Sequence, residues 1–88
     1  MEFTKPLSDQ TVTEFETATF ECEANKTKVK VTWLKDGIAL TSSSDRCDMK
    51  TRDRRHVMTL SRCELSDASE ICVKVDDVTS AAKLIVNG

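Results

Sequence analysis

Ala18-Thr19-Phe20-Glu21-Cys22-Glu23-Ala24, residues 18–24, is the stretch that decides the fold. Apolar and polar side chains alternate strictly along it, and successive side chains of a β-strand point to opposite faces. The stretch therefore predicts a strand with one face in the interior and the other in water. No stretch of the chain has a convincing helical stripe.

The same alternation continues toward both ends of the chain, with polar punctuation about every ten residues, a spacing typical of short antiparallel strands. Lys35-Asp36-Gly37 and Asp76-Asp77 offer tight turns. The inward sets are Val29, Val31 and Trp33; Cys47 and Met49; Met58 and Leu60, with Cys63 and Leu65 closing that strand; Ile71, Val73 and Val75; and Ala82, Leu84 and Val86. Seven half-polar strands predict an all-β sandwich of two antiparallel sheets around one core.

Length and composition indicate one globular domain. The chain has 88 residues, 32% of them charged, and a net charge of −2, which argues neither for a nucleic-acid binder nor for a disordered acidic tail. No apolar run approaches the roughly 18 residues of a membrane span, and Met1–Pro6 lacks the apolar core of a secretory signal. The strand-like ends suggest that residues 1–88 are a single module excised from a longer chain.

Several segments together resemble immunoglobulin domains of the intermediate, or I-set, type. They are Phe3–Leu7, Asp9–Glu14, Glu16–Glu23, Val31–Gly37 and Leu65–Ala68. The likeness is to the domains repeated along titin, obscurin, myosin-binding protein C and twitchin. It implies a Greek-key β-sandwich without cofactor. It also implies the core signature Cys22, Trp33, Leu60, Asp67, Ile71 and Val73.

The sequence departs from the family pattern at the turn into the sixth strand. The family usually reads Asp-x-Gly-x-Tyr-x-Cys, and this chain reads Asp67-Ala68-Ser69-Glu70-Ile71-Cys72-Val73. Matching Asp67 to the family's aspartate places Ile71 where the family has tyrosine and Val73 where it has the buried cysteine. The tyrosine hydroxyl bond is then absent, so we expect a corner held by packing alone.

Strand alternation tests this register independently, because a slip by one residue moves every side chain to the other face. With Val73 inward, Ile71 is also inward and Lys74 lies in water. With Cys72 inward, Glu70 and Lys74 would flank it in the core, and burying two unpaired charges costs several kcal/mol. We therefore predict Val73 inward, Cys72 outward and a sandwich without its inter-sheet disulfide.

The four cysteines allow two interpretations. They could form a secreted disulfide scaffold or remain thiols in the cytosol, and the register favours the thiols. Cys22, as a cryptic thiol, and Cys72, as an exposed one, are then candidate redox sites, with inert thiols as the simpler alternative. The sequon Asn25-Lys26-Thr27 is the main sign of an extracellular adhesion domain.

Catalysis and metal binding find little support. His56 is the only histidine, and its position beside Arg54 and Arg55 predicts an exposed residue at a hairpin tip. The cysteine spacings do not match a zinc site, and no glycine-rich phosphate loop is present. We expect neither an enzyme nor a cofactor.

A basic run is the strongest charge feature. Lys50, Arg52, Arg54 and Arg55 are a candidate patch for an acidic partner, with a solvated hairpin tip as the alternative. Nucleic acid is not expected, because no aromatic residues interleave the charges. Glu14, Glu16, Glu21 and Glu23 suggest an opposing acidic region that could face a neighbouring module.

The resemblance implies a structural and elastic module of a cytoplasmic sarcomeric protein, loaded in shear between Leu7–Thr13 and Thr79–Val86. Expected partners are neighbouring immunoglobulin or fibronectin-type domains and sarcomeric proteins, with no membrane contact and a monomeric isolated domain. One alternative is a recognition module that uses the exposed apolar residues Leu34, Ile38 and Ile85. The other is the adhesion domain, which would need a Cys22–Cys72 bond.

Overall fold

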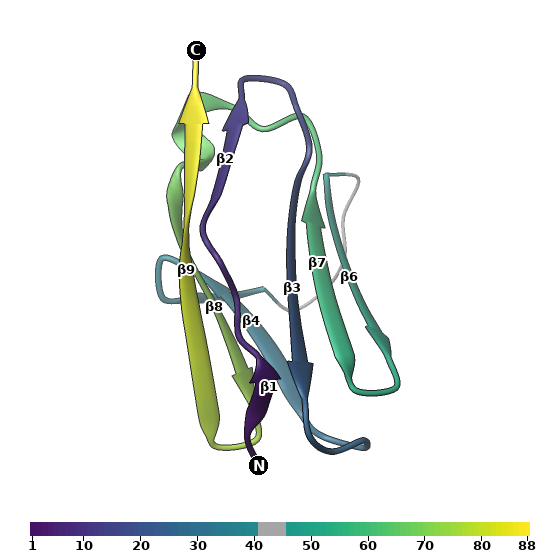
Figure 1. Ribbon diagram of the computed structural model, residues 1–88. Helices are drawn as coiled ribbons and strands as arrows, with labels where there is room; N and C mark the ends of the chain where they lie inside the picture. Colours follow the sequence, from purple (N-terminus) through teal and green to yellow (C-terminus); the bar gives the residue numbers. More distant parts are fainter. Residues whose placement is uncertain (41–45) are drawn as a thin grey trace.

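Two β-sheets packed face to face form the fold in the computed structural model, which describes residues 1–40 and 46–88 (Figure 1). The first sheet has the order β1-β3-β7-β6: β1 (Phe3–Lys5), β3 (Ala18–Ala24), β7 (Arg55–Leu60) and β6 (Cys47–Arg52). The second has the order β2-β9-β8-β4-β5: β2 (Gln10–Thr13), β9 (Val78–Asn87), β8 (Ser69–Val75), β4 (Val31–Lys35) and β5 (Ile38–Leu40). A 3-10 turn, η1 (Leu65–Asp67), joins β7 to β8. The predicted all-β sandwich is confirmed.

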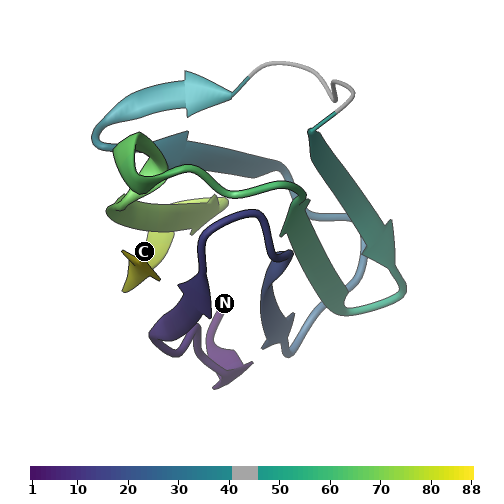
Figure 2. The same ribbon diagram turned by 90° about the horizontal axis from the view of Figure 1, so that it is seen from above.

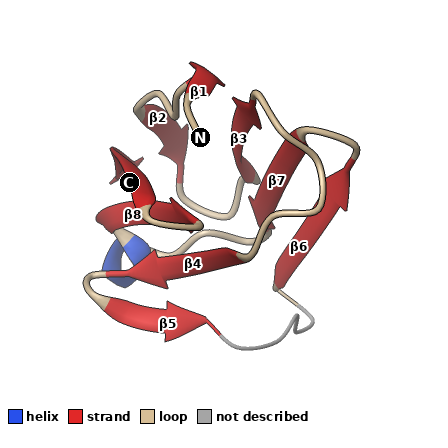
Figure 3. Cartoon of the chain, turned by 90° about the horizontal axis from the view of Figure 1, so that it is seen from below, coloured by secondary structure: helices blue, strands red, loops and turns tan. Residues whose placement is uncertain are grey.

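The core lies between the two layers, which the end views separate clearly (Figures 2 and 3). Its buried apolar members are Leu7, Ala18, Phe20, Cys22, Ala24, Trp33, Met58, Leu60, Cys63, Ile71, Val73, Val75, Ala82 and Leu84. The predicted register of β8 is confirmed, because Val73 is fully buried, Cys72 is only half-buried and Lys74 is exposed. Asp36 and Gly37 both have positive φ, as a two-residue type I′ hairpin turn requires.

The N-terminal segment differs from the expected antiparallel arrangement. It divides into β1, which pairs antiparallel with β3, and β2, which pairs parallel with β9 in the other sheet. Pro6 lies between them and has no N–H for a ladder. The described part of the chain thus contains nine strands, where alternation predicted seven.

The strand predicted to close with Cys63 and Leu65 ends earlier. β7 stops at Leu60, and Arg62 has φ 52°, which takes the chain out of extended conformation. Cys63 still reaches the core from the loop, but Leu65 begins η1 and is 52% exposed. The described residues include no helix long and apolar enough to cross a membrane.

Candidate functional site

The parallel strands β2 and β9 join the two ends of the module. Figure 1 shows the termini at opposite ends of the sandwich, with β2 and β9 running side by side toward the C-terminus. Their paired residues are Gln10 and Leu84, Thr11 and Ile85, Val12 and Val86, and Thr13 and Asn87. Two side-chain bonds extend the connection: Ser80 Oγ accepts the Leu7 N–H at 3.1 Å, and Asp9 Oδ1 accepts the Lys83 N–H at 2.8 Å. The segment predicted to carry load is therefore tied to β9 along most of its length.

The backbone N–H groups of β2 point alternately toward β9 and away from it. Beyond the end of the strand, the Glu14 N–H donates to Asn87 O at 2.6 Å. The Thr13 N–H instead donates to the Glu16 carboxylate at 2.8 Å. Because donors alternate sides along a strand, the Val12 N–H faces β9 and the Thr11 N–H faces away. β2 is at the sheet edge, so the Thr11 N–H points toward water.

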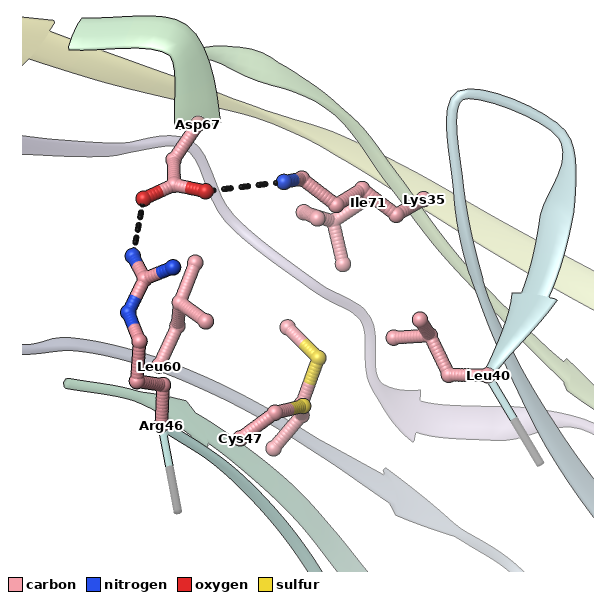
Figure 4. A pocket seen from close by; sticks show the side chains of 8 residues that line it. Lys35, Leu40, Arg46, Cys47, Leu60, Asp67 and Ile71 are labelled. Carbon is pink, nitrogen blue, oxygen red and sulfur yellow. Dashed lines mark hydrogen bonds and ion pairs between the residues drawn. The ribbon is translucent and has the colours of Figure 1, made fainter. Parts of the chain in front are cut away.

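A charge clamp, defined as Lys35, Arg46 and Asp67, ties the two sheets together (Figure 4). Asp67 ends η1, and its side chain is only 8% exposed. Its Oδ1 accepts a hydrogen bond from Lys35 Nζ at 2.9 Å, and its Oδ2 accepts one from the Arg46 guanidinium and one from the Glu64 N–H at 2.7 Å. Lys35 belongs to β4 and Arg46 immediately precedes β6, so one carboxylate connects elements of both layers.

The clamp sets the protonation of its members. Burial alone would raise the pKa of Asp67, but the Glu64 N–H and the two cations outweigh it and lower that pKa below the usual 3.8. The hydrogen bond to Asp67 raises the pKa of Arg46. Asp67 is thus ionised at neutral pH, and both of its carboxylate oxygens accept hydrogen bonds.

The clamp corrects the expectation of a corner held by packing alone. An apolar pocket lies beneath it, lined by Leu40, Cys47, Met58, Leu60 and Ile71 (Figure 4). Ile71 is buried there and has no hydroxyl to offer. Charged and capping hydrogen bonds around Asp67 hold the corner instead, together with the Ser69 hydroxyl, which donates to Asp67 O at 2.8 Å. Sequence reasoning selected Asp67 but missed Lys35 and Arg46, because a strand lysine and a loop arginine read as solvated charges.

The candidate redox thiols are both protonated at neutral pH. Burial, with Glu21 nearby, raises the pKa of Cys22 to about 11. Burial also raises the pKa of Cys72, and Glu70, whose Oε1 lies 3.6 Å from the sulfur, raises it further. A thiolate is the reactive form, so neither environment activates its thiol. The redox role stays a prediction that this geometry does not favour. Among the described residues, no three His, Cys, Asp or Glu side chains gather as metal ligands would.

The prediction that His56 is exposed was wrong. The hairpin turn centres on Asp53, with φ 54°, and β7 begins at Arg55, so His56 is already a strand residue on the inward face. It is fully buried and lies opposite Cys22 of β3. Its Nδ1 is 3.0 Å from Thr51 Oγ1, and its Nε2 has no hydrogen-bond partner within residues 1–40 and 46–88. The sequence prediction failed because His56 directly follows two exposed arginines. Arg54 lies in the turn and Arg55 is the first residue of β7, whereas His56 is the first residue of the strand that faces the core.

Burial of His56 makes the module sensitive to mild acid. Burial lowers the pKa of His56 below the usual 6.5, so the unfolded chain binds the proton more readily than the folded one. The stability that the neutral His56 imidazole contributes is fully present above pH 6.5, and it is lost as the pH falls toward the folded-state pKa. We expect the free energy of unfolding to fall by up to about 1.4 kcal/mol per pH unit in that window. Urea unfolding at a series of pH values measures the slope.

His56→Gln is the control, because glutamine does not titrate. Its free energy of unfolding should change less between about pH 7.5 and about pH 5.5 than that of the parent. Equal slopes for the two proteins would show that His56 is not the group responsible.

The basic hairpin, defined as Lys50, Arg52, Arg54 and Arg55, lies at the β6–β7 turn, and all four residues are exposed. Arg55 Nε is 3.2 Å from Glu21 Oε1, and Lys50 Nζ is 3.4 Å from Asp48 Oδ2. A shallow hollow at the tip is lined by Glu23 and Asp53 as well as by arginines. Acidic neighbours thus partly neutralise the hairpin.

The predicted acidic region is divided between the two ends of the module. Glu21 and Glu23 lie on β3 beside the basic hairpin, whereas Glu14 and Glu16 belong to the turn between β2 and β3 at the C-terminal end. The expectation that all four glutamates oppose the basic run is therefore wrong for the pair on β3. A linear sequence does not reveal that β3 and β7 are neighbours in register.

The remaining signature residues come together as expected. Cys22, Trp33, Leu60, Ile71 and Val73 all belong to the buried cluster. None of Cys22, Cys63 and Cys72 is in a disulfide. Asp67 lies at the rim of this cluster and makes the clamp.

Comparison with known proteins agrees with this architecture. The family model described as "Immunoglobulin I-set domain" matches residues 1–86. Cardiac-type myosin-binding protein C of Mus musculus is 34% identical over 84 residues, which is 94% of this chain and 7% of that protein. Titin of Drosophila melanogaster is 32% identical over 85 residues, 97% of this chain and under 1% of its own length. The crystal structure of the I9–I11 tandem from titin superposes with a TM-score of 0.93 at 30% identity, covering 98% of this chain and 32% of that one.

Proposed function

Because the chain belongs to the immunoglobulin I-set family, we propose that it is a non-catalytic mechanical link in a longer sarcomeric protein. The relatives are muscle proteins of which a stretch this long is a small part. The proposed partners are neighbouring immunoglobulin-type modules of the same chain, and the proposed location is the myofibril.

The parallel pairing of β2 with β9 is the observation that carries this proposal. Force applied at the two termini pulls β2 and β9 in opposite directions along their common axis. The hydrogen bonds between them are then loaded together and must break nearly together, which resists force better than breaking them singly. Val12, Leu84 and Val86 hold the two strands against the core from the inner side.

Val12→Pro should weaken the module against force. Proline removes the N–H that faces β9 and leaves its acceptor unpaired, at a cost of about 1–3 kcal/mol. We expect a clear fall in the unfolding force in single-molecule pulling experiments through the two termini.

Thr11→Pro is the matched control, because the N–H it removes points toward water at the edge of the sheet. Its unfolding force should stay close to that of the parent. If the two proline variants unfold at the parent's force, β2–β9 is not the load-bearing pair and the proposed function loses its support.

A recognition function is the second candidate. Ile38 is 71% exposed on β5, which is an edge strand, and Ile85 is 43% exposed on β9. Leu34 contributes less because it is half-buried. Salt-resistant capture of one muscle protein that Ile38→Ser abolishes would favour this function. The adhesion alternative needs Cys22 and Cys72 to face each other, and Cys72 points out of the core.

A further inference from the structure

Phe15 occupies a backbone position that suits glycine. The Glu16 N–H donates to Thr13 O at 3.0 Å, which closes a four-residue turn. Phe15 is the third residue of this turn and has φ 73°, whereas Glu14 is not among the residues with positive φ. That combination is a type II turn, whose third position favours glycine because a side chain clashes there. A bulky residue in this conformation is a genuine outlier that strains its own module.

Packing within the module does not compensate this strain. The Phe15 side chain is 69% exposed, so the ring contributes little to the core. Leu65, which is 52% exposed, is the second large apolar residue at this end. Two exposed apolar side chains in one place, one of them on a strained backbone, indicate a contact made outside the module.

Phe15 and Leu65 flank the point where the chain leaves the sandwich. The Phe15 N–H donates to Cys63 O at 2.6 Å, which ties this turn to the loop that leads into η1. The Glu14 N–H donates to Asn87 O at 2.6 Å. On the other side, a Cβ placed on Gly88 would lie 3.8 Å from Leu65 Cδ2. A chain that continues beyond Gly88 therefore leaves the sandwich beside Leu65, close to the turn that holds Phe15.

We propose that Phe15 and Leu65 form the seat for the N-terminal end of the next module, and so fix the angle between consecutive modules. This inference rests on the proposed function, in which the chain is one link in a row. It adds that the joint at Gly88 is a packed contact and not a free hinge.

The chain exit points to the following module as the occupant, because Gly88 lies beside Leu65 and Asn87 is hydrogen-bonded to Glu14 in the turn that holds Phe15. Glu14, Glu16 and Glu64 are sequence neighbours of the apolar pair, and Arg62 is exposed in the same loop as Glu64. The end near the N-terminus carries exposed side chains of both signs: the basic Lys26, Lys28 and Arg54, and the acidic Glu2, Asp53 and Asp76. Charge is therefore mixed at both ends, and the position of the chain exit, not charge, indicates the occupant.

The test is Phe15→Gly in two proteins: the single module, and the natural two-module fragment made of this module and its C-terminal neighbour. In the single module, glycine relieves the backbone strain, and we expect the Tm to stay unchanged or to rise by up to about 5 °C. In the fragment, ¹⁵N relaxation should show the parent modules tumbling as one body. The same variant should lower the rotational correlation time of this module toward its value alone.

Ile38→Ser is the matched control, because it removes an equally exposed apolar side chain from the side of the sandwich, and it should leave the fragment rigid. A second variant, Leu65→Ser, should loosen the joint as Phe15→Gly does. Independent tumbling in the parent fragment, or unchanged rigidity in both end variants, would overturn the inference. So would a lower Tm of the single Phe15→Gly module, because the ring would then be packing within its own module.

These outcomes are separable from failure of the proposed function. The rigidity of the joint depends on Phe15 and Leu65, whereas the unfolding force depends on the β2–β9 ladder. A Phe15→Gly fragment that stays rigid, together with a Val12→Pro module that unfolds at lower force, would contradict the seat and support the mechanical link. A flexible Phe15→Gly fragment together with a Val12→Pro module that unfolds at the parent's force would support the seat and contradict the mechanical link.

Discussion

Trp33→Ala should remove most of the stability of the module. The indole is 3% exposed in β4, between Leu40 of β5 and Val73 of β8 in the register of the sheet, and it faces the core. Truncation to alanine loses the buried area and leaves a cavity that the two rigid sheets cannot close, at a cost of about 3–5 kcal/mol. A domain of this size has a total stability near the low end of about 5–15 kcal/mol. A large unfolded fraction at 37 °C is the expected result.

Urea unfolding followed by far-UV circular dichroism measures this change, because Trp33 is the only tryptophan and its fluorescence is lost with it. Phe15→Ala is the control: it also removes an aromatic ring, but from a side chain that is 69% exposed. A Trp33→Ala protein that melts within a few degrees of the parent would contradict the core assignment.

Asp67→Ala should have the second largest effect. The substitution removes the shared acceptor of both cations and of the Glu64 N–H. Removing one partner of a buried ion pair costs about 3–5 kcal/mol. Lys35 and Arg46 are partly exposed, so water can solvate them once the carboxylate is gone. We therefore expect the free energy of unfolding to fall by about 2–3 kcal/mol. Urea unfolding at neutral pH measures the loss.

The pKa of Asp67 gives a second, independent test of the clamp. That pKa is lowered in the folded state, so the stability from ionised Asp67 is present above its usual 3.8 and is lost as pH falls toward the folded value. The difference between the parent and Asp67→Asn should therefore shrink in acid. Lys35→Met, which leaves Asp67 with the Arg46 guanidinium and the Glu64 N–H, should cost less than Asp67→Ala. An equal or greater loss for Lys35→Met would show that the carboxylate is not the centre of the clamp.

The clamp and the core together explain how this module holds its two sheets without a bond between Cys22 and its opposite residue. Val73 fills the inward position on β8, so the contact between the layers there is apolar. Asp67 then adds a charged connection at one end of the sandwich.

Local pattern determined the strands and their faces. The alternation around Cys22, and the charges on either side of Cys72, fixed which residues face the core, because one misplaced strand residue would bury a charge. The same reasoning placed Ile71 and Val73 correctly. Asp67 was identified as a signature residue from the family resemblance, because the sequence does not reveal which residues pair with it.

The sequence by itself determined the all-β sandwich, the β8 register and most of the core, because those features depend on period-two burial that any short window reveals. Only the tertiary structure decided the features that depend on which distant segments meet. These include the parallel pairing of β2 with β9, the clamp that draws Lys35 and Arg46 onto Asp67, and the burial of His56. They also include the backbone hydrogen bond from Phe15 to Cys63, which ties the turn that holds Phe15 to the loop that leads to Leu65. The physical reason is that hydrogen-bonded partners and ion pairs are set by the packing of whole sheets, which no local spacing encodes.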